Sequence, residues 1–362
     1  MRLHPTPGQA HYFARAAGTA RFVFNWALAE WKAQYEAGGK PNATALKKQF
    51  NAIRREQFPW SYEVTKCAIE GAFMDVAAAF KNFFAGRKAG RKVGYPKFKS
   101  KKRSKACFYL ANDKFSVGDH WIEVPKLGRV NMAEQLRLTG KILSARISKS
   151  ADWWFVSITV EMPDVVPHNQ HPPVGIDVGL NRLATLSDGR RYENQRPLGH
   201  LLKKLRRLNK ELARRTKGGK NWHKTKSKLA RLHYRIACQR GDLLHKLTTE
   251  VARTSGLVAV EDLHVKGLLR NRCLSRSFSD AALGTLLALL ESKVPQAGGV
   301  VVKVGRFYPS SQLCHCCGSR RADLRLEERI YRCANPACSY VGDRDKNASC
   351  NIVQEALRLV GP

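Results

Sequence analysis

The sequence predicts a multidomain protein that combines a helical unit, a small antiparallel β-barrel and a mixed α/β domain with an inserted metal-binding ribbon. Three observations predict this architecture. The chain has 362 residues, more than a typical single domain. Its apolar periodicity changes from helical to alternating, and then to strands that alternate with helices. Two pairs of closely spaced cysteines lie late in the sequence, at 314–317 and 333–338.

The first part of the chain has the pattern of a helical unit. Apolar side chains recur at helical spacing, and Gly38, Gly39 and Pro59 interrupt the pattern. Three helices are therefore expected, at 9–37, 44–57 and 62–84. A basic, glycine-rich stretch from Gly86 to Lys105 follows them.

Short strands dominate the next part, and they indicate a small barrel of the oligonucleotide-binding type. The strands are expected at 107–110, 121–124, 141–147 and 153–160, with a hairpin turn at 148–152. Four prolines between Pro163 and Pro173 then predict an interdomain linker.

The last part predicts a mixed α/β layer fold, because strands come first in a hairpin series and then alternate with helices. Strands are expected at 174–179, 183–186, 190–192, 256–261 and 300–304. Helices are expected at 197–216, 222–254 and 279–295, with a final helix from about Asn347.

Composition points to a polyanionic partner. Lys and Arg number 64 against 29 Asp and Glu, which gives a formal net charge of +35. Such a charge repels itself unless it meets a polyanion, and nucleic acid is the leading candidate. No apolar run is long enough to span a bilayer, so no membrane partner is expected. The scattered cysteines and the lack of a signal peptide favour a reducing cytosol.

Two basic stretches are the strongest candidates for nucleic-acid contact. In the first, aromatic residues alternate with basic ones, which suits stacking on bases together with phosphate neutralisation. Its candidates are Tyr95, Lys97, Phe98, Lys99, Lys101, Lys102 and Arg103. The second is a helix with one leucine-rich face and one basic face. Its candidates are Lys203, Lys204, Arg206, Arg207, Lys210 and Arg214.

The late cysteines have the spacing of a four-thiolate zinc site. The expected ligands are Cys314, Cys317, Cys333 and Cys338. Cys316 is a rival for Cys317, although Gly318 favours Cys317 as the knuckle residue. Four thiolates leave no open position, so the zinc would be structural.

Three carboxylates are candidates for a second metal site. Asp177 and Glu261 each end an apolar strand, and Asp345 lies near the start of the last helix. A carboxylate on an apolar strand needs a partner or a metal ion. If the three converge, they can hold two Mg²⁺ ions, and such a site supports phosphodiester hydrolysis.

Several linked motifs, in order, resemble the transposon-encoded TnpB family of RNA-guided nucleases, which are relatives of Cas12 effectors. The motifs are RLHPTPGQ at 2–9, RFVFNW at 21–26, AFKNFF at 79–84, GYPKFKS at 94–100, GIDVGL at 175–180, EDLHVKG at 261–267, YPSSQ at 308–312 and DRDKNA at 343–348.

The resemblance implies an RNase H-like RuvC nuclease domain with Asp177, Glu261 and Asp345 as magnesium ligands, and Asp343 as the rival for the third place. It also implies four parts. These are a wedge-like barrel (1–8 and 87–170), a helical recognition domain (9–86), the nuclease domain (171–312 and 343–362) and a zinc ribbon that binds target nucleic acid (313–342).

The implied function is RNA-guided, Mg²⁺-dependent cleavage of double-stranded target DNA next to a short flanking motif. One protein copy per guide RNA in a bacterial cytosol is expected. Lys66 and Lys81 are candidates for reading the flanking motif. The alternatives are a miniature Cas12-like CRISPR effector, a nuclease-inactive RNA-guided repressor, and a DNA-joining transposase with a similar acidic triad. The presence of all three carboxylates argues against the repressor, which would be expected to lose one or more of them.

Overall fold

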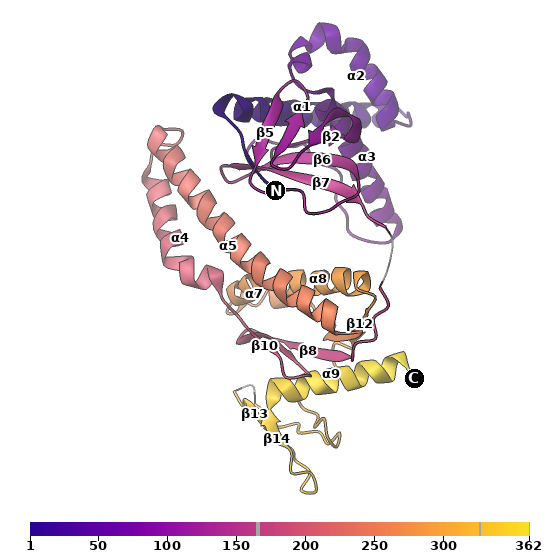
Figure 1. The fold of residues 1–362 in the computed structure, drawn as a ribbon, viewed down its shortest axis with the longest axis vertical. Helices are drawn as coiled ribbons and strands as arrows, with labels where there is room; N and C mark the ends of the chain where they lie inside the picture. Colours follow the sequence, from indigo (N-terminus) through magenta and orange to yellow (C-terminus); the bar gives the residue numbers. More distant parts are fainter. Residues whose placement is uncertain (164–166, 326, 362) are drawn as a thin grey trace. The chain divides into compact units, whose positions relative to one another are not determined.

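The computed structural model describes residues 1–163, 167–325 and 327–361. The chain divides into two compact units, Met1–Pro163 and Asp164–Pro362, whose elements are labelled in Figure 1. Three residues of the predicted linker, 164–166, lie outside the described residues. None of the described helices is long and apolar enough to cross a membrane.

A seven-stranded antiparallel sheet forms the frame of the first unit, in the order β2-β6-β7-β1-β5-β4-β3. Its strands are β1 (Arg2–His4), β2 (Cys107–Ala111), β3 (Ser116–Val117), β4 (Trp121–Val124), β5 (Gly128–Met132), β6 (Lys141–Ser150) and β7 (Trp153–Glu161). The short N-terminal strand β1 lies in the middle, where Leu3 faces Trp154 on one side and Met132 on the other. No pairing in the described residues joins β2 to β3, so hydrogen bonds do not close the sheet into the predicted barrel.

The helices of this unit pack against the sheet and against each other. They are α1 (Pro7–Glu36), α2 (Ala43–Gln57), the 3₁₀ segment η1 (Pro59–Glu63), α3 (Lys66–Lys88) and the 3₁₀ segment η2 (Asn112–Lys114). Phe13 of α1 and Ala68 of α3 share one core with Phe108 and Ile147 of the sheet.

Local chemistry explains where the helix boundaries differ from the prediction. Helix α1 starts earlier because the Thr6 side chain accepts a hydrogen bond from the Gln9 backbone, and the Gln9 side chain accepts one from Thr6, forming a capping box. Helix α3 continues to Lys88, and the Ala89 N–H at its C-terminal cap donates to the Ala85 carbonyl. A glycine is required at position 86 within it, because a Cβ there would lie 2.4 Å from Val93 Cγ2.

The hairpin between β6 and β7 is tighter than the predicted turn at 148–152. Pairing continues to Ser150 and Trp153, so the connection contains only Ala151 and Asp152. Ala151 adopts the left-handed conformation with φ of 51°. Two-residue hairpin turns use such left-handed residues, because their twist matches that of the strands.

A five-stranded mixed sheet organises the second unit, in the order β10-β9-β8-β11-β12. Strands β8, β11 and β12 are parallel, and β9 is antiparallel to β8. Strand β10 pairs antiparallel with β9, so it runs in the same direction as β8. The strands are β8 (Val174–Val178), β9 (Arg182–Leu186), β10 (Arg191–Glu193), β11 (Leu257–Glu261) and β12 (Val300–Val304).

Helices cover both faces of this sheet (Figure 1). Strands β8, β9 and β11 share the larger core with α5 and α8, and Ala259 and Val304 share a smaller core with α9 on the opposite face. The helices are α4 (Pro197–Arg214), α5 (Lys220–Thr254), α6 (Val265–Leu268), α7 (Ser275–Ala281), α8 (Leu283–Gln296) and α9 (Arg344–Val360).

Two helix predictions need correction. The single helix expected at 279–295 is two helices, α7 and α8, because Ala282 between them is left-handed with φ of 52°. The last helix starts at Arg344 rather than near Asn347, because the Asp343 side chain caps it. Before it, β13 (Ile330–Arg332) and β14 (Val341–Asp343) form a two-stranded ribbon.

Candidate active site and cysteine cluster

Strand alternation directs Asp177 and Glu261 toward helix α9. Gly175 lies two residues before Asp177 on β8, so the two share a face of the sheet. A Cβ at Gly175 would lie only 2.0 Å from the Ser349 backbone oxygen, so this face packs closely on α9. Ala259 lies two residues before Glu261 on β11 and belongs to the core formed with α9. Both carboxylates therefore lie on the α9 side.

Helix α9 brings the third carboxylate to the same side. Its first turn contains Asp345, and the preceding Asp343 accepts hydrogen bonds from the backbone N–H groups of Asp345 (3.0 Å) and Lys346 (3.1 Å). The cap fixes where the helix starts, and this sets the position of Asp345.

Asp177 and Asp345 line one cavity of about 340 Å³. The remaining lining residues are Val178, Gly179, Leu180, Asn181, Arg182, Thr185, Ser311, Arg329 and Arg344. Glu261 does not line it. One of its carboxylate oxygens, Oε1, accepts a hydrogen bond of 2.6 Å from Ser310 Oγ.

The electrostatics of Asp177 show that the three carboxylates are neighbours. Burial raises the pKa of Asp177 well above its usual range, and the negative charges of Glu261 and Asp345 raise it further. Arg344 opposes this shift without reversing it. Two neighbouring carboxylates therefore act on Asp177, and such a group of acids favours binding of a cation beside it.

The neighbouring Asp343 is in the opposite situation. Burial raises its pKa, but the hydrogen bonds from Arg182 and from the Lys346 backbone outweigh burial and leave the pKa below its usual range. Arg182 Nη1 lies 2.6 Å from Asp343 Oδ2, and Arg191 Nη2 lies 3.4 Å from the same oxygen. The oxygens of Asp343 are thus occupied by cations and backbone donors.

Asp345 has weaker partners. Its Oδ1 lies 3.8 Å from Arg344 Nε and 3.9 Å from Arg329 Nη1, both beyond hydrogen-bonding distance. Its carboxylate is therefore more available to a metal ion than that of Asp343.

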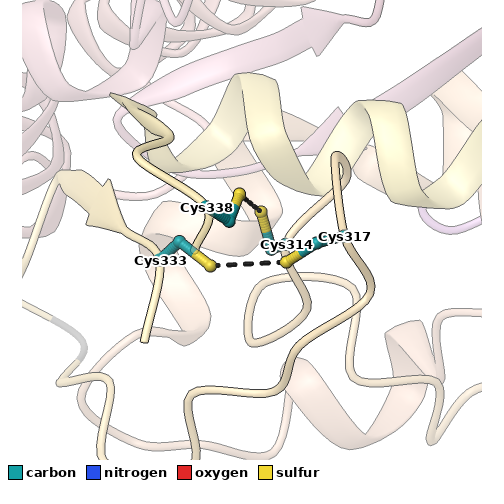
Figure 2. Close-up of side chains that lie close together, drawn as sticks. All are labelled: Cys314, Cys317, Cys333 and Cys338. Carbon is teal, nitrogen blue, oxygen red and sulfur yellow. Dashed lines mark hydrogen bonds between the residues drawn. The ribbon is translucent and has the colours of Figure 1, made fainter. Parts of the chain in front are cut away.

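Figure 2 shows the four predicted cysteines converging from the two knuckles. Sγ of Cys314 lies 3.8 Å from Sγ of Cys338, and Sγ of Cys317 lies 3.5 Å from Sγ of Cys333. A tetrahedral ion with Zn–S bonds of about 2.3 Å needs sulfurs about 3.8 Å apart. The thiols therefore fit such an ion, and Cys316 is outside the group.

The two groups differ in how closely their ligand atoms approach. Within residues 1–163, 167–325 and 327–361, the four cysteines are the sole set of three or more His, Cys, Asp or Glu ligand atoms that lie within 4.8 Å of one another. The three carboxylates are more widely spread. This spacing does not exclude a two-ion site, where ions about 4 Å apart share the ligands.

Most of the predicted nucleic-acid contacts are exposed. The helix α4 carries six of them on its outer face, and Lys66, Lys81, Lys97 and Phe98 are exposed as well, as are Lys101, Lys102 and Arg103. The candidates on α4 belong to the second unit, and the other candidates belong to the first.

Lys99 and Tyr95 are engaged within the first unit. Lys99 Nζ lies 2.9 Å from Asp75 Oδ2 and 3.9 Å above the ring of Phe24. Asn25 also bonds the backbone of Lys99 through both its amide atoms, at 2.7 and 2.8 Å. Tyr95 packs edge-on against the rings of Phe80 and Phe83. These contacts anchor the basic segment.

The sequence interpretation assigned no role to Ser310 or to Arg182. Both contact the acidic residues directly, Ser310 at Glu261 and Arg182 at Asp343. Ser310 lies in the YPSSQ motif, between β12 and the first cysteine. That motif was the sequence signal that could have pointed to Ser310. Arg182 belongs to no motif, and its contact depends on the pairing of β8 with β9.

Three family models match parts of the chain. A family described as "Probable transposase" (OrfB of IS605) matches residues 157–272. A Cas12f1-like TNB domain matches 284–352, and a helix-turn-helix domain matches 1–40. In the structure, residues 1–40 contain β1 and one continuous helix, α1, rather than two helices joined by a turn.

Curated relatives match almost the whole chain. A protein of Streptomyces pristinaespiralis named "Putative RNA-guided DNA endonuclease" is 32% identical over 98% of this chain and 88% of its own length. A protein of Escherichia coli K12 with the same description, InsQ, is 32% identical over 98% of this chain and 90% of its own length. The chain belongs to the TnpB family.

A solved structure shows a similar fold. The structure described as the Cas12f1–sgRNA–target DNA complex aligns with a TM-score of 0.56 at 17% identity, over 94% of this chain and 82% of that chain. The chain thus has the multidomain α/β fold of Cas12-type proteins.

Proposed function

We propose that this protein is an RNA-guided, Mg²⁺-dependent DNA endonuclease encoded by a transposable element. One observation carries the proposal: Asp177 and Asp345 line one cavity, where the charges of Asp345 and Glu261 raise the pKa of Asp177. A group of carboxylates of this kind in a chain with a net charge of +35 suits the hydrolysis of a polyanion held by the basic surface. The relatives named as endonucleases support it.

Asp177, Glu261 and Asp345 are the proposed magnesium ligands, in an RNase H-like, RuvC-type domain. Their oxygen donors and the mutual repulsion of their charges fit a hard divalent cation. When bound, two such ions would supply an activated water and stabilise the charge on the leaving oxygen. Asp343 would serve instead as the helix cap, because its oxygens are already paired with Arg182 and backbone donors.

The cysteine cluster is proposed to hold structural zinc through Cys314, Cys317, Cys333 and Cys338. The sulfur separations support this assignment. The described part of the ribbon contains two three-residue strands, so core burial alone gives it little stability. Zinc would supply what the small core lacks.

The guide RNA and target DNA would bind along basic surfaces on both units. Six exposed basic residues on α4 suit contact with the backbone of a guide–target duplex, which needs no sequence-specific side chains. The exposed Lys97, Phe98 and Lys101 suit contact with phosphates and bases beside the wedge-like strands. Lys66 and Lys81 remain the candidates for reading the flanking motif. We propose one protein copy per guide RNA.

The decisive experiment compares the wild-type protein with Asp177→Ala. Each protein is purified with its guide RNA and given a target plasmid with Mg²⁺. We expect wild-type cleavage to follow the guide sequence, and Asp177→Ala to lose on the order of 10³-fold or more in cleavage rate while it still binds RNA and target.

Three results would contradict the proposal, and each identifies an alternative. Binding without cleavage by the wild-type protein would indicate an RNA-guided repressor. Strand joining in place of free ends would indicate a transposase. Full cleavage by Asp177→Ala would remove Asp177 from the metal site. The exposed Asp242→Ala is the matched control, because among the described residues its side chain pairs with Lys246 on the same helix.

A further inference from the structure

A buried serine, Ser310, contacts the Glu261 carboxylate of the proposed active site. Ser310 is 3% exposed, and its hydroxyl donates a 2.6 Å hydrogen bond to Glu261 Oε1. This bond uses one carboxylate oxygen and leaves Oε2 for another ligand. A glutamate side chain has three rotatable bonds, so a short bond to a fixed donor restricts where its carboxylate can lie.

Helix α9 holds Ser310 in place. Asn351, which is 2% exposed, donates from Nδ2 to the Ser310 backbone oxygen at 2.8 Å and to the Leu313 oxygen at 2.7 Å. The Ser310 backbone N–H also donates to the Tyr308 oxygen at 2.9 Å. The backbone of Ser310 is therefore fixed on both sides.

Two further amides on the same face of α9 extend this attachment toward the cysteine cluster. Asn347, fully buried, donates to the Leu313 oxygen at 2.6 Å and accepts from the His315 N–H at 3.0 Å. Gln354 donates to the His315 oxygen at 2.9 Å. Residues 347, 351 and 354 are spaced for one helical face, so a single row of amides binds the segment 310–315.

We propose that Ser310 is a positioning residue for Glu261, held by Asn351 from α9, and that it sets the affinity of the site for divalent metal. The proposal rests on the proposed function of Glu261 as a metal ligand. Partners that orient a metal ligand commonly change metal affinity or activity by about 10–100-fold when they are removed. The segment that continues from Ser310 into Cys314 would then join the cysteine cluster to the carboxylate site.

The test compares Ser310→Ala with Ser255→Ala. Ser255 is a matched control, because it is 1% exposed in the same unit and its hydroxyl has no hydrogen-bond partner among the described residues. We measure Mn²⁺ binding by electron paramagnetic resonance, the Mg²⁺ concentration for half-maximal cleavage, KM for target DNA, and thermal unfolding.

For Ser310→Ala we expect Mn²⁺ affinity to fall on the order of 10-fold and the Mg²⁺ requirement to rise by a similar factor. KM for DNA should stay unchanged, and saturating Mg²⁺ should restore most of the cleavage rate. Ser310→Thr, which keeps the hydroxyl, should restore much of the affinity. Unchanged Mn²⁺ affinity in a folded Ser310→Ala protein would overturn the proposal.

A double-mutant cycle separates positioning of Glu261 from a general effect on the fold. In a Glu261→Ala background, Ser310→Ala should change Mn²⁺ affinity no further. An equal loss in both backgrounds would overturn the proposal. If the wild-type protein binds Mn²⁺ but does not cleave DNA, the proposed function fails. The double-mutant cycle of Mn²⁺ affinities still decides whether Ser310 positions Glu261.

Discussion

Asp75 in the first unit and Asp177 in the second are both partly buried acids, and their surroundings shift their pKa values in opposite directions. Burial raises the pKa of both carboxyls. At Asp75 the hydrogen bonds from Arg146 (3.0 Å) and Lys99 (2.9 Å) outweigh burial and leave the pKa below its usual range. At Asp177 the neighbouring carboxylates add to the effect of burial.

The difference distinguishes an acid that stabilises the fold from one that needs an external cation. Asp75 of α3 joins β6 to the anchored basic segment, so its charge is balanced within the protein. The charge of Asp177 is not balanced, and such imbalance is typical of functional sites. Asp343 and Asp345 repeat the contrast two residues apart, since Arg182 balances only the first.

The largest expected effect separates Asp345 from Asp343. Asp345→Ala should reduce guided cleavage on the order of 10³-fold, because it removes a proposed metal ligand without removing a cap or an ion pair at hydrogen-bonding distance. Asp343→Ala should mainly lower the melting temperature, because a lost N-cap destabilises a helix by about 1 kcal/mol. Cleavage rates at saturating Mg²⁺ and thermal unfolding of both variants check this.

The opposite ranking would reverse the assignment. Suppose that Asp343→Ala is fully folded and yet does not cleave at saturating Mg²⁺, while Asp345→Ala cleaves normally. Asp343 would then be the third ligand. Excess Mg²⁺ is the control for weakened metal binding. It should restore the cleavage rate of a variant that merely binds Mg²⁺ less tightly, but not of a variant that lacks a metal ligand.

The second prediction concerns the balanced acid. Asp75→Asn should destabilise the first unit by about 1–3 kcal/mol, because two charge-assisted hydrogen bonds are weakened. The pKa of Asp75 is lowered in the fold, so its contribution is full above the pKa of the unfolded chain and is lost as the pH falls through the lowered value. The melting-temperature difference between wild type and variant should therefore shrink in acid.

The exposed Asp119→Asn is the matched control for Asp75→Asn, and it should leave the melting temperature almost unchanged. A difference at Asp75 that stayed constant down to pH 2 would contradict the ion-pair interpretation. It would indicate instead that shape or packing at this position matters more than charge.

The sequence alone pointed to Asp177 as a special carboxylate but not to Asp75, for a physical reason. Asp177 ends an apolar strand, where a carboxylate stands out. Asp75 lies within an ordinary helix, and its partner Arg146 is on a strand far along the chain, so only the tertiary fold brings them together. For the same reason the sequence could not reveal that the ammonium group of Lys99 pairs with Asp75, and the predicted contact of Lys99 with nucleic acid stays a prediction.

Strands and most helices of the second unit could be predicted because their apolar patterns are long and regular. Features set by one or two residues could not. The left-handed Ala282 divides a helix whose apolar pattern continues across it. The choice between Asp343 and Asp345 depends on which residue caps α9, and both have the composition of a cap.

The smallest expected effect tests the unbalanced acid in metal-free protein. Because the pKa of Asp177 is raised, the folded state holds its proton more tightly than the unfolded chain does. Its contribution to stability is therefore greatest below the unfolded pKa and is lost as the pH rises toward the raised value. Asp177→Asn should match the wild type near pH 3 and melt a few °C higher at neutral pH.

Divalent metal should reverse that advantage. Mg²⁺ binds the folded wild-type site and stabilises it by mass action, whereas Asp177→Asn binds it weakly and gains little. The exposed Asp242→Asn should show neither effect. If metal-free Asp177→Asn were less stable than the wild type at neutral pH, the carboxylate would have a partner within the fold, and Asp177 would belong with Asp75 as an acid that stabilises the structure.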